Sequence, residues 1–307
     1  MLRRFLLYLS AAAWARRMVT GWGMARGVAR RFVAGETLDD AMTVTHTLNA
    51  AGLAVTLDYL GESIHKAKDT EPVVAAYRAV LERIAAENAR SSISLKLTHL
   101  GLDISEDLCQ ANLRHILTDA QALGVPVTID MESSVYTDAT LRIYRTMRDE
   151  YGFANVSAVI QAYLYRSADD MRALASEGAH IRLCKGAYLE PPEVAYPDKA
   201  DVDANYVRLM QDFLQAPPPA YLCIATHDET MIAAAETFIR ERAIGRDRFE
   251  FQMLYGIRPQ RQQALAAAGY LVRIYVPFGE AWYPYFMRRL AERPANLWFF
   301  ARSLFRR

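Results

Sequence analysis

The 307-residue sequence has only three cysteines, Cys109, Cys184 and Cys223, far apart and without a C-x-x-C pair. This set excludes a disulfide scaffold and a zinc finger and favours a reducing, cytoplasmic location. Lys and Arg number 36 against 35 Asp and Glu, so the global basic field of a nucleic-acid-binding protein is absent. The six histidines form no H-x-H or H-E-x-x-H pattern, and G-x-S-x-G is missing. The sequence therefore predicts neither a metal site nor a serine hydrolase.

Long apolar runs are also missing, which limits the interpretation of the N-terminus. The apolar stretch 5–14 is too short to span a bilayer, because a spanning helix needs about 20 apolar residues. It lies between arginine pairs, in a segment of 35 residues with seven arginines and no acidic residue. Three interpretations stay open: a signal peptide, a basic helix on a membrane surface, and a helix packed on the main domain.

Strand and helix signals alternate along the rest of the chain, in which apolar residues make up 52% of the composition. Eight apolar, often β-branched runs predict strands at 53–60, 91–97, 125–131, 156–161, 179–184, 221–226, 249–254 and 271–276. Segments with helical spacing lie at 73–87, 108–123, 139–148, 168–175, 205–214, 231–242, 260–268 and 282–291. Ser105 and Ser167 are predicted to begin helices, and Gly124 and Gly269 to end them.

This order of elements predicts an α/β fold with parallel strands. Eight βα units in about 250 residues match the size of a TIM-like (βα)8 barrel. A doubly wound sheet would have a glycine-rich phosphate turn after its first strand, but this strand ends in Tyr59-Leu60-Gly61-Glu62. We therefore expect a barrel catalytic domain over residues 51–307 and an N-terminal helical extension over residues 1–50.

Polar residues gather at the predicted C-terminal ends of the strands, where barrel enzymes place their chemistry. Lys96 and Asp130 follow adjacent strands and are expected to neutralise each other, either in a site or as a structural ion pair. Arg182 alternates with apolar neighbours, so it is expected to point into the barrel. The strand-end groups are Asp58, Glu62, Lys96, Thr98, His99, Asp130, Glu132, Gln161, Tyr163, Arg182, Lys185, Tyr188, Thr226, His227, Asp228, Gln252, Tyr255, Arg273 and Tyr275.

Two other basic features suit an anionic ligand. Lys185 is followed by Gly186 and Ala187, whose small side chains allow a ligand to approach the backbone, although an ordinary βα turn explains them equally well. Arg288 and Arg289 are adjacent on the last predicted helix and diverge by about 100°. Both reach one carboxylate only through their long side chains, and the alternative is a solvated basic face.

Eight motifs in order resemble the FAD-dependent proline dehydrogenase family, in its monofunctional bacterial form. They are SLKLTHLG (94–101), TIDME (128–132), QAYLYR (161–166), IRLCKGAY (181–188), ATHD (225–228), FQMLYG (251–256), RIYVPFGEAWYPY (273–285) and RRLAE (288–292). The likeness extends over roughly residues 35–300. It implies noncovalent FAD at the strand ends, oxidation of L-proline to Δ1-pyrroline-5-carboxylate, and electron transfer to a membrane quinone. A cytoplasmic protein with peripheral contact on the inner face of the membrane is then expected.

The resemblance also implies roles for individual residues. Lys96, Asp130 and Arg182 are the expected catalytic residues, and Glu62 is expected to close the site by pairing with Arg288. The expected substrate contacts are Lys96, Leu254, Tyr275, Tyr285, Arg288 and Arg289. The expected FAD contacts are Met131, Gln161, Arg182, Lys185, Gly186, Ala187, Thr226, His227 and Glu292. This sequence has leucine at position 189, where some members of the family have an aromatic residue.

Two other functions are open from the residues alone. A Schiff-base aldolase would use Lys96 or Lys185 as its nucleophile. A non-enzymatic protein docked on a membrane would account for the basic N-terminus. A flavin spectrum that responds to proline distinguishes the dehydrogenase from both.

Overall fold

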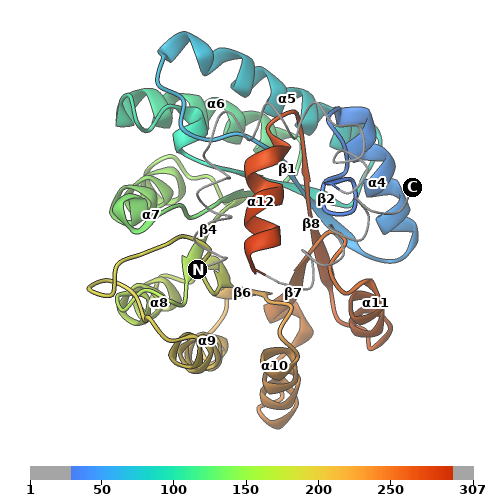
Figure 1. Cartoon of the computed structure of the whole chain (residues 1–307), viewed down its shortest axis with the longest axis vertical. Helices are drawn as coiled ribbons and strands as arrows, with labels where there is room; N and C mark the ends of the chain where they lie inside the picture. Colours follow the sequence, from blue (N-terminus) through green and yellow to red (C-terminus); the bar gives the residue numbers. More distant parts are fainter. Residues whose placement is uncertain (1–28, 293–307) are drawn as a thin grey trace.

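The computed structural model describes residues 29–292, with side chains up to residue 287. Eight parallel strands close into one barrel in chain order, which confirms the predicted fold class (Figure 1). The strands are β1 (Ala54–Tyr59), β2 (Ser91–Leu95), β3 (Val127–Ile129), β4 (Val156–Gln161), β5 (His180–Cys184), β6 (Tyr221–Ala225), β7 (Phe249–Leu254) and β8 (Val272–Phe278). All eight predicted strands are present, and β3 is shorter than predicted.

The helices that follow the strands surround the barrel. They are α5 (Glu71–Ala86), α6 (Glu106–Ala122), α7 (Thr137–Arg145), α8 (Ser167–Ser176), α9 (Lys199–Leu214), α10 (Glu229–Glu241) and α11 (Pro259–Ala267). Short helical turns lie at η1 (Ala67–Asp69), η2 (Thr98–Leu100), η3 (Ser134–Tyr136), η4 (Thr146–Glu150, a π-helical turn) and η5 (Arg246–Arg248). The apolar faces of strands and helices form one continuous core.

The four predicted helix boundaries are confirmed. The Ser105 hydroxyl caps α6 by accepting from the Leu108 backbone N–H at 3.4 Å. Gly124 and Gly269 follow α6 and α11 with φ of 67° and 80°, as expected of C-terminal glycines. Ser167 is the first residue of α8, as predicted, but it does not cap the helix, because its hydroxyl donates to the Gln161 carbonyl at 2.6 Å.

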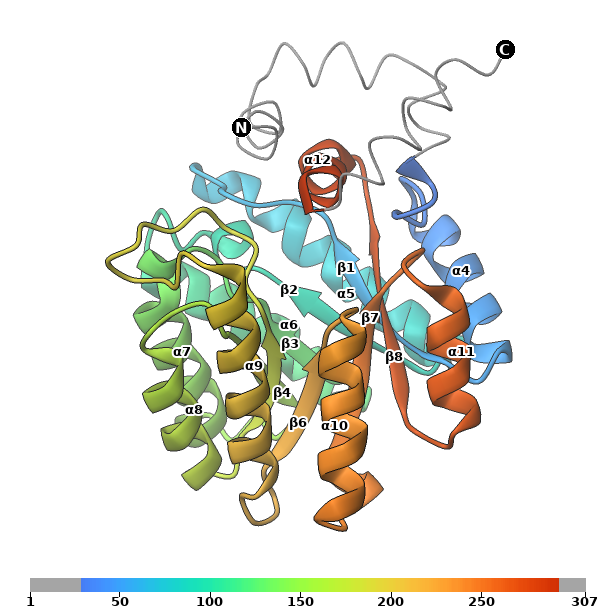
Figure 2. The same ribbon diagram turned by 60° about the horizontal axis from the view of Figure 1, so that its bottom comes forward.

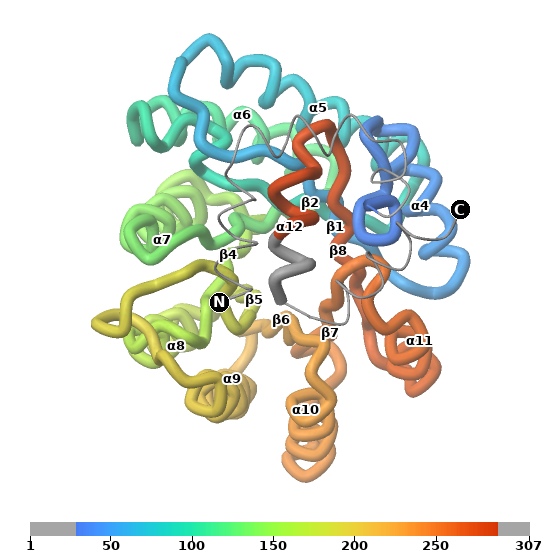
Figure 3. Tube along the Cα trace, viewed as in Figure 1, coloured from blue at the N-terminus to red at the C-terminus, as the bar shows by residue number. Residues whose placement is uncertain are grey.

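Two helices depart from the regular barrel order. Helix α4 (Leu38–Ala50) precedes β1 and packs on β1 and β8, between α11 and α5 (Figure 3). Helix α12 (Trp282–Glu292) follows β8 but lies across the end of the barrel where the strands end (Figures 1 and 2). Helix α4 thus takes the outer position that the helix after β8 would hold in a regular barrel, which leaves α12 to cover the mouth.

The N-terminal extension is described only in part. Ala41 and Met42 of α4 belong to the core of the barrel. The proposed division at residue 50 stays a prediction, and the arginine-rich residues 1–28 lie outside the described part of the chain. Within residues 29–292, no helix is long and apolar enough to cross a membrane.

Candidate active site

Polar and charged side chains line the interior of the barrel. Arg182 of β5 contacts Ser94 of β2 and Gln252 of β7, which are not its neighbouring strands, so its side chain crosses the interior. Bulky aliphatic residues usually fill this space, and buried charges are stable there only when they are paired. The inward-facing residues include Thr56, Asp58, Ser92, Ser94, Thr128, Ser157, Arg182, Glu250, Gln252, Arg273 and Tyr275.

Asp130 lies just after β3 and accepts hydrogen bonds on both carboxylate oxygens. Arg182 Nη1 lies 2.5 Å from Oδ1, and the Ser94 hydroxyl donates to the same oxygen at 2.8 Å. The Tyr275 hydroxyl donates to Oδ2 at 2.7 Å. Residues from β2, β5 and β8 therefore converge on this carboxylate, and the prediction that Arg182 points into the barrel is confirmed.

The structure corrects the expected ion pair between Lys96 and Asp130. Asp130 pairs with Arg182, whereas Lys96 Nζ lies 3.7 Å from Asp58 Oδ1. The expectation rested on the order of neighbouring strands. A long side chain inside a barrel reaches across the interior, so its partner need not be on the next strand.

The Arg182 guanidinium is available to a ligand on one side. Arg182 is 6% exposed, and its Nη2 has no hydrogen-bond partner among the residues that the structure describes. Its guanidinium carbon lies 5.3 Å from the centroid of the Tyr275 ring. Burial, followed by the charge of Asp130, raises the pKa of Tyr275 well above its ordinary value, so the phenol stays protonated. The cluster therefore offers a fixed cation and a neutral hydroxyl.

A second cation follows β5. Lys185 Nζ lies 2.6 Å from Asp203 Oδ1 and 3.1 Å from Asp228 Oδ2. Gly186 has a φ of 110°, and a Cβ atom there would lie 2.4 Å from Cδ1 of Tyr163. Only glycine fits this turn without strain. The bare backbone predicted beside Lys185 is thus required by the local geometry.

The ends of β4, β6 and β7 complete the mouth of the barrel. Gln161 is buried, and its Oε1 has no hydrogen-bond partner within the described residues. His227 Nε2 accepts from the Leu254 backbone N–H at 2.7 Å, which joins the ends of β6 and β7. The Thr226 hydroxyl accepts from the Asp228 backbone N–H at 3.1 Å. Met131 is buried beside this mouth, just after Asp130.

The loop 60–66 carries Glu62 and is fixed on both sides of it. Before Glu62, Gly61 packs so closely on His99 that a Cβ would lie 2.1 Å from the ring. After it, the Ser63 backbone N–H donates to the Thr98 hydroxyl at 3.1 Å. Burial, and then the charge of Lys96, lowers the pKa of His99 to about 4, so its ring is neutral at physiological pH.

The anchor of this loop continues to the end of β3. Glu132 accepts from the Thr98 hydroxyl at 2.6 Å and from its backbone N–H at 3.1 Å. Burial raises the pKa of Glu132, which the two hydrogen bonds from Thr98 partly oppose. The position of Glu62 thus depends on the strand ends beside it.

Helix α12 carries the remaining predicted substrate contacts. Tyr285 is buried in a cluster with Phe32, Leu60 and Phe286. Arg288, Arg289 and Glu292 lie on the same helix, but their side chains are outside the described part of the structure. The expected carboxylate clamp and the expected pair between Glu62 and Arg288 therefore stay predictions.

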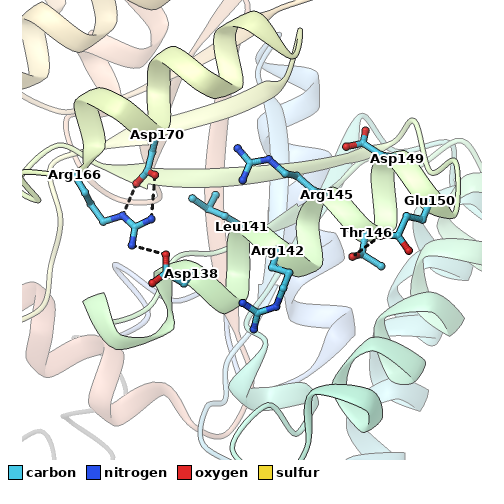
Figure 4. A pocket seen from close by; sticks show the side chains of 9 residues that line it. All are labelled: Asp138, Leu141, Arg142, Arg145, Thr146, Asp149, Glu150, Arg166 and Asp170. Carbon is cyan, nitrogen blue, oxygen red and sulfur yellow. Dashed lines mark hydrogen bonds and ion pairs between the residues drawn. The ribbon is translucent and has the colours of Figure 1, made fainter.

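A cavity on the outer side of the barrel lies away from this mouth, between α7 and α8 (Figure 4). Its basic side chains are already neutralised. Arg166 pairs with Asp138 and Asp170, each at 2.7 Å, and Arg145 pairs with Glu177 at 2.7 Å. We do not assign it to the site.

Comparison with known proteins agrees with this geometry. A family model described as "Proline dehydrogenase" matches residues 41–302 of the chain. The chain belongs to the proline dehydrogenase family. This membership supports proline dehydrogenase activity, and hence an oxidoreductase of proline catabolism.

Full-length relatives are monofunctional. The chain is 43% identical to "Proline dehydrogenase 1" of Bacillus subtilis over 307 residues, covering 100% of both proteins. It is 44% identical to "Proline dehydrogenase" of Deinococcus radiodurans over 281 residues, covering 90% of each. A solved structure of proline utilization A (PutA) from Bdellovibrio bacteriovorus matches with a TM-score of 0.80 and 27% identity. That match covers 87% of this chain and only 32% of the PutA chain.

The proline dehydrogenase fold thus brings most of the predicted residues to one end of the barrel. Asp130, Arg182 and Tyr275 form one hydrogen-bonded group, and Lys96 lies 3.7 Å from Asp58. The predicted FAD contacts follow β3, β4, β5 and β6 at the same end of the barrel. Their assignment to substrate or cofactor stays a prediction.

Sequence reasoning gave no role to two of the buried residues. Ser94 and Glu250 hydrogen bond within the same interior network. Side chains alternate along a strand, so Ser94 lies on the same face of β2 as Lys96, and Glu250 on the same face of β7 as Gln252. This two-residue alternation is the sequence signal that could have identified Ser94 and Glu250. Glu190 was also missed: it accepts from the backbone and hydroxyl of Ser134 at 2.7 and 2.5 Å and ties the loop after β5 to η3.

Proposed function

We propose that this protein oxidises L-proline to Δ1-pyrroline-5-carboxylate, with FAD as its cofactor and a membrane quinone as electron acceptor. One observation carries the proposal. A buried cluster of Asp130, Arg182 and Tyr275 lies at the catalytic end of a barrel whose sequence belongs to the proline dehydrogenase family. The cofactor, the product and the acceptor are inferred from the resemblance together with this site.

The residues at the barrel mouth fit FAD. Gln161 Oε1 and Arg182 Nη2 are both buried without a partner in the described part of the chain. Buried polar atoms are nearly always satisfied, so two such atoms at one barrel end support a ligand there. Lys185, whose ammonium is held by Asp203 and Asp228, precedes the half-buried glycine turn at Gly186. The proposed contacts are Met131, Gln161, Arg182, Lys185, Gly186, Ala187, Thr226, His227 and Glu292.

Arg182 is the residue on which the proposed chemistry depends most. Bound FAD supplies a two-electron acceptor for the hydride that leaves the proline carbon beside the nitrogen. The positive charge of Arg182 would stabilise the negative charge that develops in this transfer. Asp130 and Ser94 already hold the guanidinium in place, so the charge needs no reorganisation during the reaction.

Substrate recognition is proposed to combine α12 with the strand ends. Arg288 and Arg289 would bind the proline carboxylate through the paired hydrogen bonds that guanidinium groups favour. The other proposed contacts are Lys96, Leu254, Tyr275 and Tyr285. The Tyr275 hydroxyl donates to Asp130 within the buried cluster, which supports its assignment.

The absorption spectrum of the purified protein tests this function. We expect a flavin spectrum whose visible absorbance bleaches when L-proline is added. A protein that neither contains nor takes up FAD would contradict the proposal. Borohydride trapping of a substrate on Lys96 or Lys185 would favour the aldolase, whereas proline-dependent dye reduction eliminates the non-enzymatic alternative.

The close contact of Gly61 with His99 gives a prediction for the proposed Glu62 gate. In Gly61→Ala the added methyl group meets the His99 ring at 2.1 Å, so the loop 60–66 must shift. We expect kcat/KM for proline to fall roughly 10-fold, a change of about 1.4 kcal/mol, because a displaced gate closes the site less well. Steady-state kinetics with a dye acceptor measure this.

The double variant Gly61→Ala/His99→Ala is the matched control. Removing the ring makes room for the new methyl group, so we expect the double variant to recover activity relative to Gly61→Ala. If Gly61→Ala alone has wild-type kinetics, or if the double variant recovers nothing beyond it, the contact does not position Glu62.

The arginine-rich N-terminus is the proposed site of membrane contact. Its apolar stretch 5–14 between arginine pairs suits a helix on an anionic bilayer surface. We expect deletion of residues 1–28 to reduce flotation with anionic vesicles while dye-linked proline oxidation continues. Unchanged flotation would contradict a membrane role for this segment.

A further inference from the structure

A continuous chain of buried hydrogen bonds runs through the barrel interior from Arg273 to Asp130. Arg273 pairs with Glu250 through Nε at 2.7 Å and Nη2 at 3.1 Å. Gln252 donates from Nε2 to Glu250 Oε1 at 2.6 Å and accepts on Oε1 from Arg182 Nε at 2.5 Å. Arg182 Nη1 then reaches Asp130 at 2.5 Å. The proposed function uses only the Asp130 end of this chain.

The base of the chain is itself held firmly. Arg273 Nη1 donates to the Val55 carbonyl at 3.1 Å, and the Glu250 carboxylate is 2% exposed. Such a bidentate, buried pair is fixed in geometry. Gln252 connects this pair to Arg182, and it is 6% exposed.

The chemistry at position 252 suits an amide side chain. Arg182 Nε can only donate, and an ionised Glu250 can only accept. The residue between them must therefore accept at one atom and donate at another, as an amide does. A carboxylate supplies only acceptors at neutral pH, and an aliphatic side chain supplies neither group.

Gln252 also determines which side of the guanidinium faces the site. With Nε bound to Gln252 and Nη1 bound to Asp130 and Ser94, rotation of the guanidinium is blocked. Nη2 is the nitrogen left without a partner in the described residues. Without the bond to Nε, the group can turn about the Asp130 contact and direct Nη2 elsewhere.

We propose that Gln252, supported by the Glu250–Arg273 pair, is a positioning residue that orients Arg182 for the oxidation. It acts through Arg182 and not by contact with the substrate. This inference rests on the proposed function for its catalytic readout, but its structural part can be measured without the cofactor.

The first test replaces Gln252 by leucine, which keeps the size and removes both hydrogen bonds. We expect kcat to fall roughly 10- to 100-fold with a smaller change in KM, because the buried Arg182 Nε loses its acceptor. The midpoint potential of the bound flavin should become more negative as the cation is less well directed at it. A loss of stability alone would not shift that potential.

Thr128→Val is the matched control. The Thr128 hydroxyl is buried in the same interior and hydrogen bonds to the Ser157 hydroxyl at 2.9 Å, but not to the chain that holds Arg182. We expect this variant to keep the wild-type kcat and flavin potential. If Gln252→Leu behaves like Thr128→Val in both measurements, the positioning role is refuted.

The second test, Gln252→Glu, gives a pH signature. The introduced carboxyl reproduces the amide only while it is protonated, because it can then donate to Glu250 and accept from Arg182. Burial beside the Glu250 carboxylate raises its folded-state pKa, and the opposing charge of Arg182 is already neutralised by Asp130. The folded protein therefore loses stability relative to wild type as pH rises through that pKa. The titratable groups around it are His180, Arg182, Tyr221, Cys223, Glu250, Arg273, Tyr275 and Asp130.

These two tests separate the possible failures. If the wild-type protein has no flavin that responds to proline, the proposed function is refuted. The melting temperature of Gln252→Glu, measured against pH, still tests whether Gln252 links Glu250 to Arg182. We expect its deficit from wild type to grow with rising pH. If the melting temperature of Gln252→Glu differs from that of the wild type by the same amount at every pH, or not at all, the assignment of Gln252 is overturned. This test remains decisive even if Gln252→Leu does not fold.

Discussion

Replacing Asp130 by alanine is expected to lower kcat/KM for proline about 100- to 1,000-fold, which corresponds to a loss of about 2.7–4 kcal/mol in transition-state stabilisation. The Arg182 guanidinium would keep its charge but lose its counterion at 2.5 Å. The Tyr275 and Ser94 hydroxyls would lose their acceptor as well. Steady-state kinetics and thermal melting measure the two consequences.

Two controls define the cause. Asp130→Asn keeps an acceptor of the same shape without the charge, so its activity should lie between those of the wild type and Asp130→Ala. Asp119→Ala breaks an ion pair with Arg78 on the surface, where both side chains are solvent-accessible, and such pairs contribute at most about 1 kcal/mol. A fully active Asp130→Ala would contradict the role of the cluster.

The barrel was predictable because its signal is periodic and local. Apolar runs at all eight strands and amphipathic spacing between them reproduce the observed alternation. The position of α12 was harder to predict, because its apolar residues indicate a buried helix but not which surface that helix covers. The same signal occurs in helices of the outer ring, and only the packing of α4 on β1 and β8 leaves the mouth to α12.

For the polar cluster inside the barrel, the sequence predicted several of the members but not how they pair. Position along the strands pointed to Lys96 and Asp130, just after β2 and β3, and alternation pointed to Arg182 within β5. Neither signal was sufficient to pair them, because Arg182 spans the interior from β5 to reach Asp130, while Lys96 approaches Asp58. Such contacts depend on side-chain direction inside a closed barrel, which strand order does not specify.

The second large effect is a loss of stability at the Arg273–Glu250 end of the buried hydrogen-bond chain. Arg273→Met is expected to destabilise the fold by about 3–5 kcal/mol at neutral pH, because it leaves the Glu250 carboxylate buried without its cation. Denaturant unfolding at several pH values measures this. The partner variant Glu250→Gln/Arg273→Met removes both charges, so we expect it to be more stable than Arg273→Met alone.

The pH dependence distinguishes lost charge pairing from lost packing. In the wild type, burial acts to raise the pKa of Glu250, but Arg273 and the hydrogen bond from Gln252 lower it overall. Its ionised form therefore contributes stability at neutral pH that is lost as pH falls through the folded-state pKa. Without Arg273 burial dominates and the folded-state pKa rises, so the carboxyl takes up a proton more readily. The deficit of Arg273→Met should therefore shrink as pH falls, whereas a deficit that is constant with pH and shared by the double variant would attribute the loss to packing.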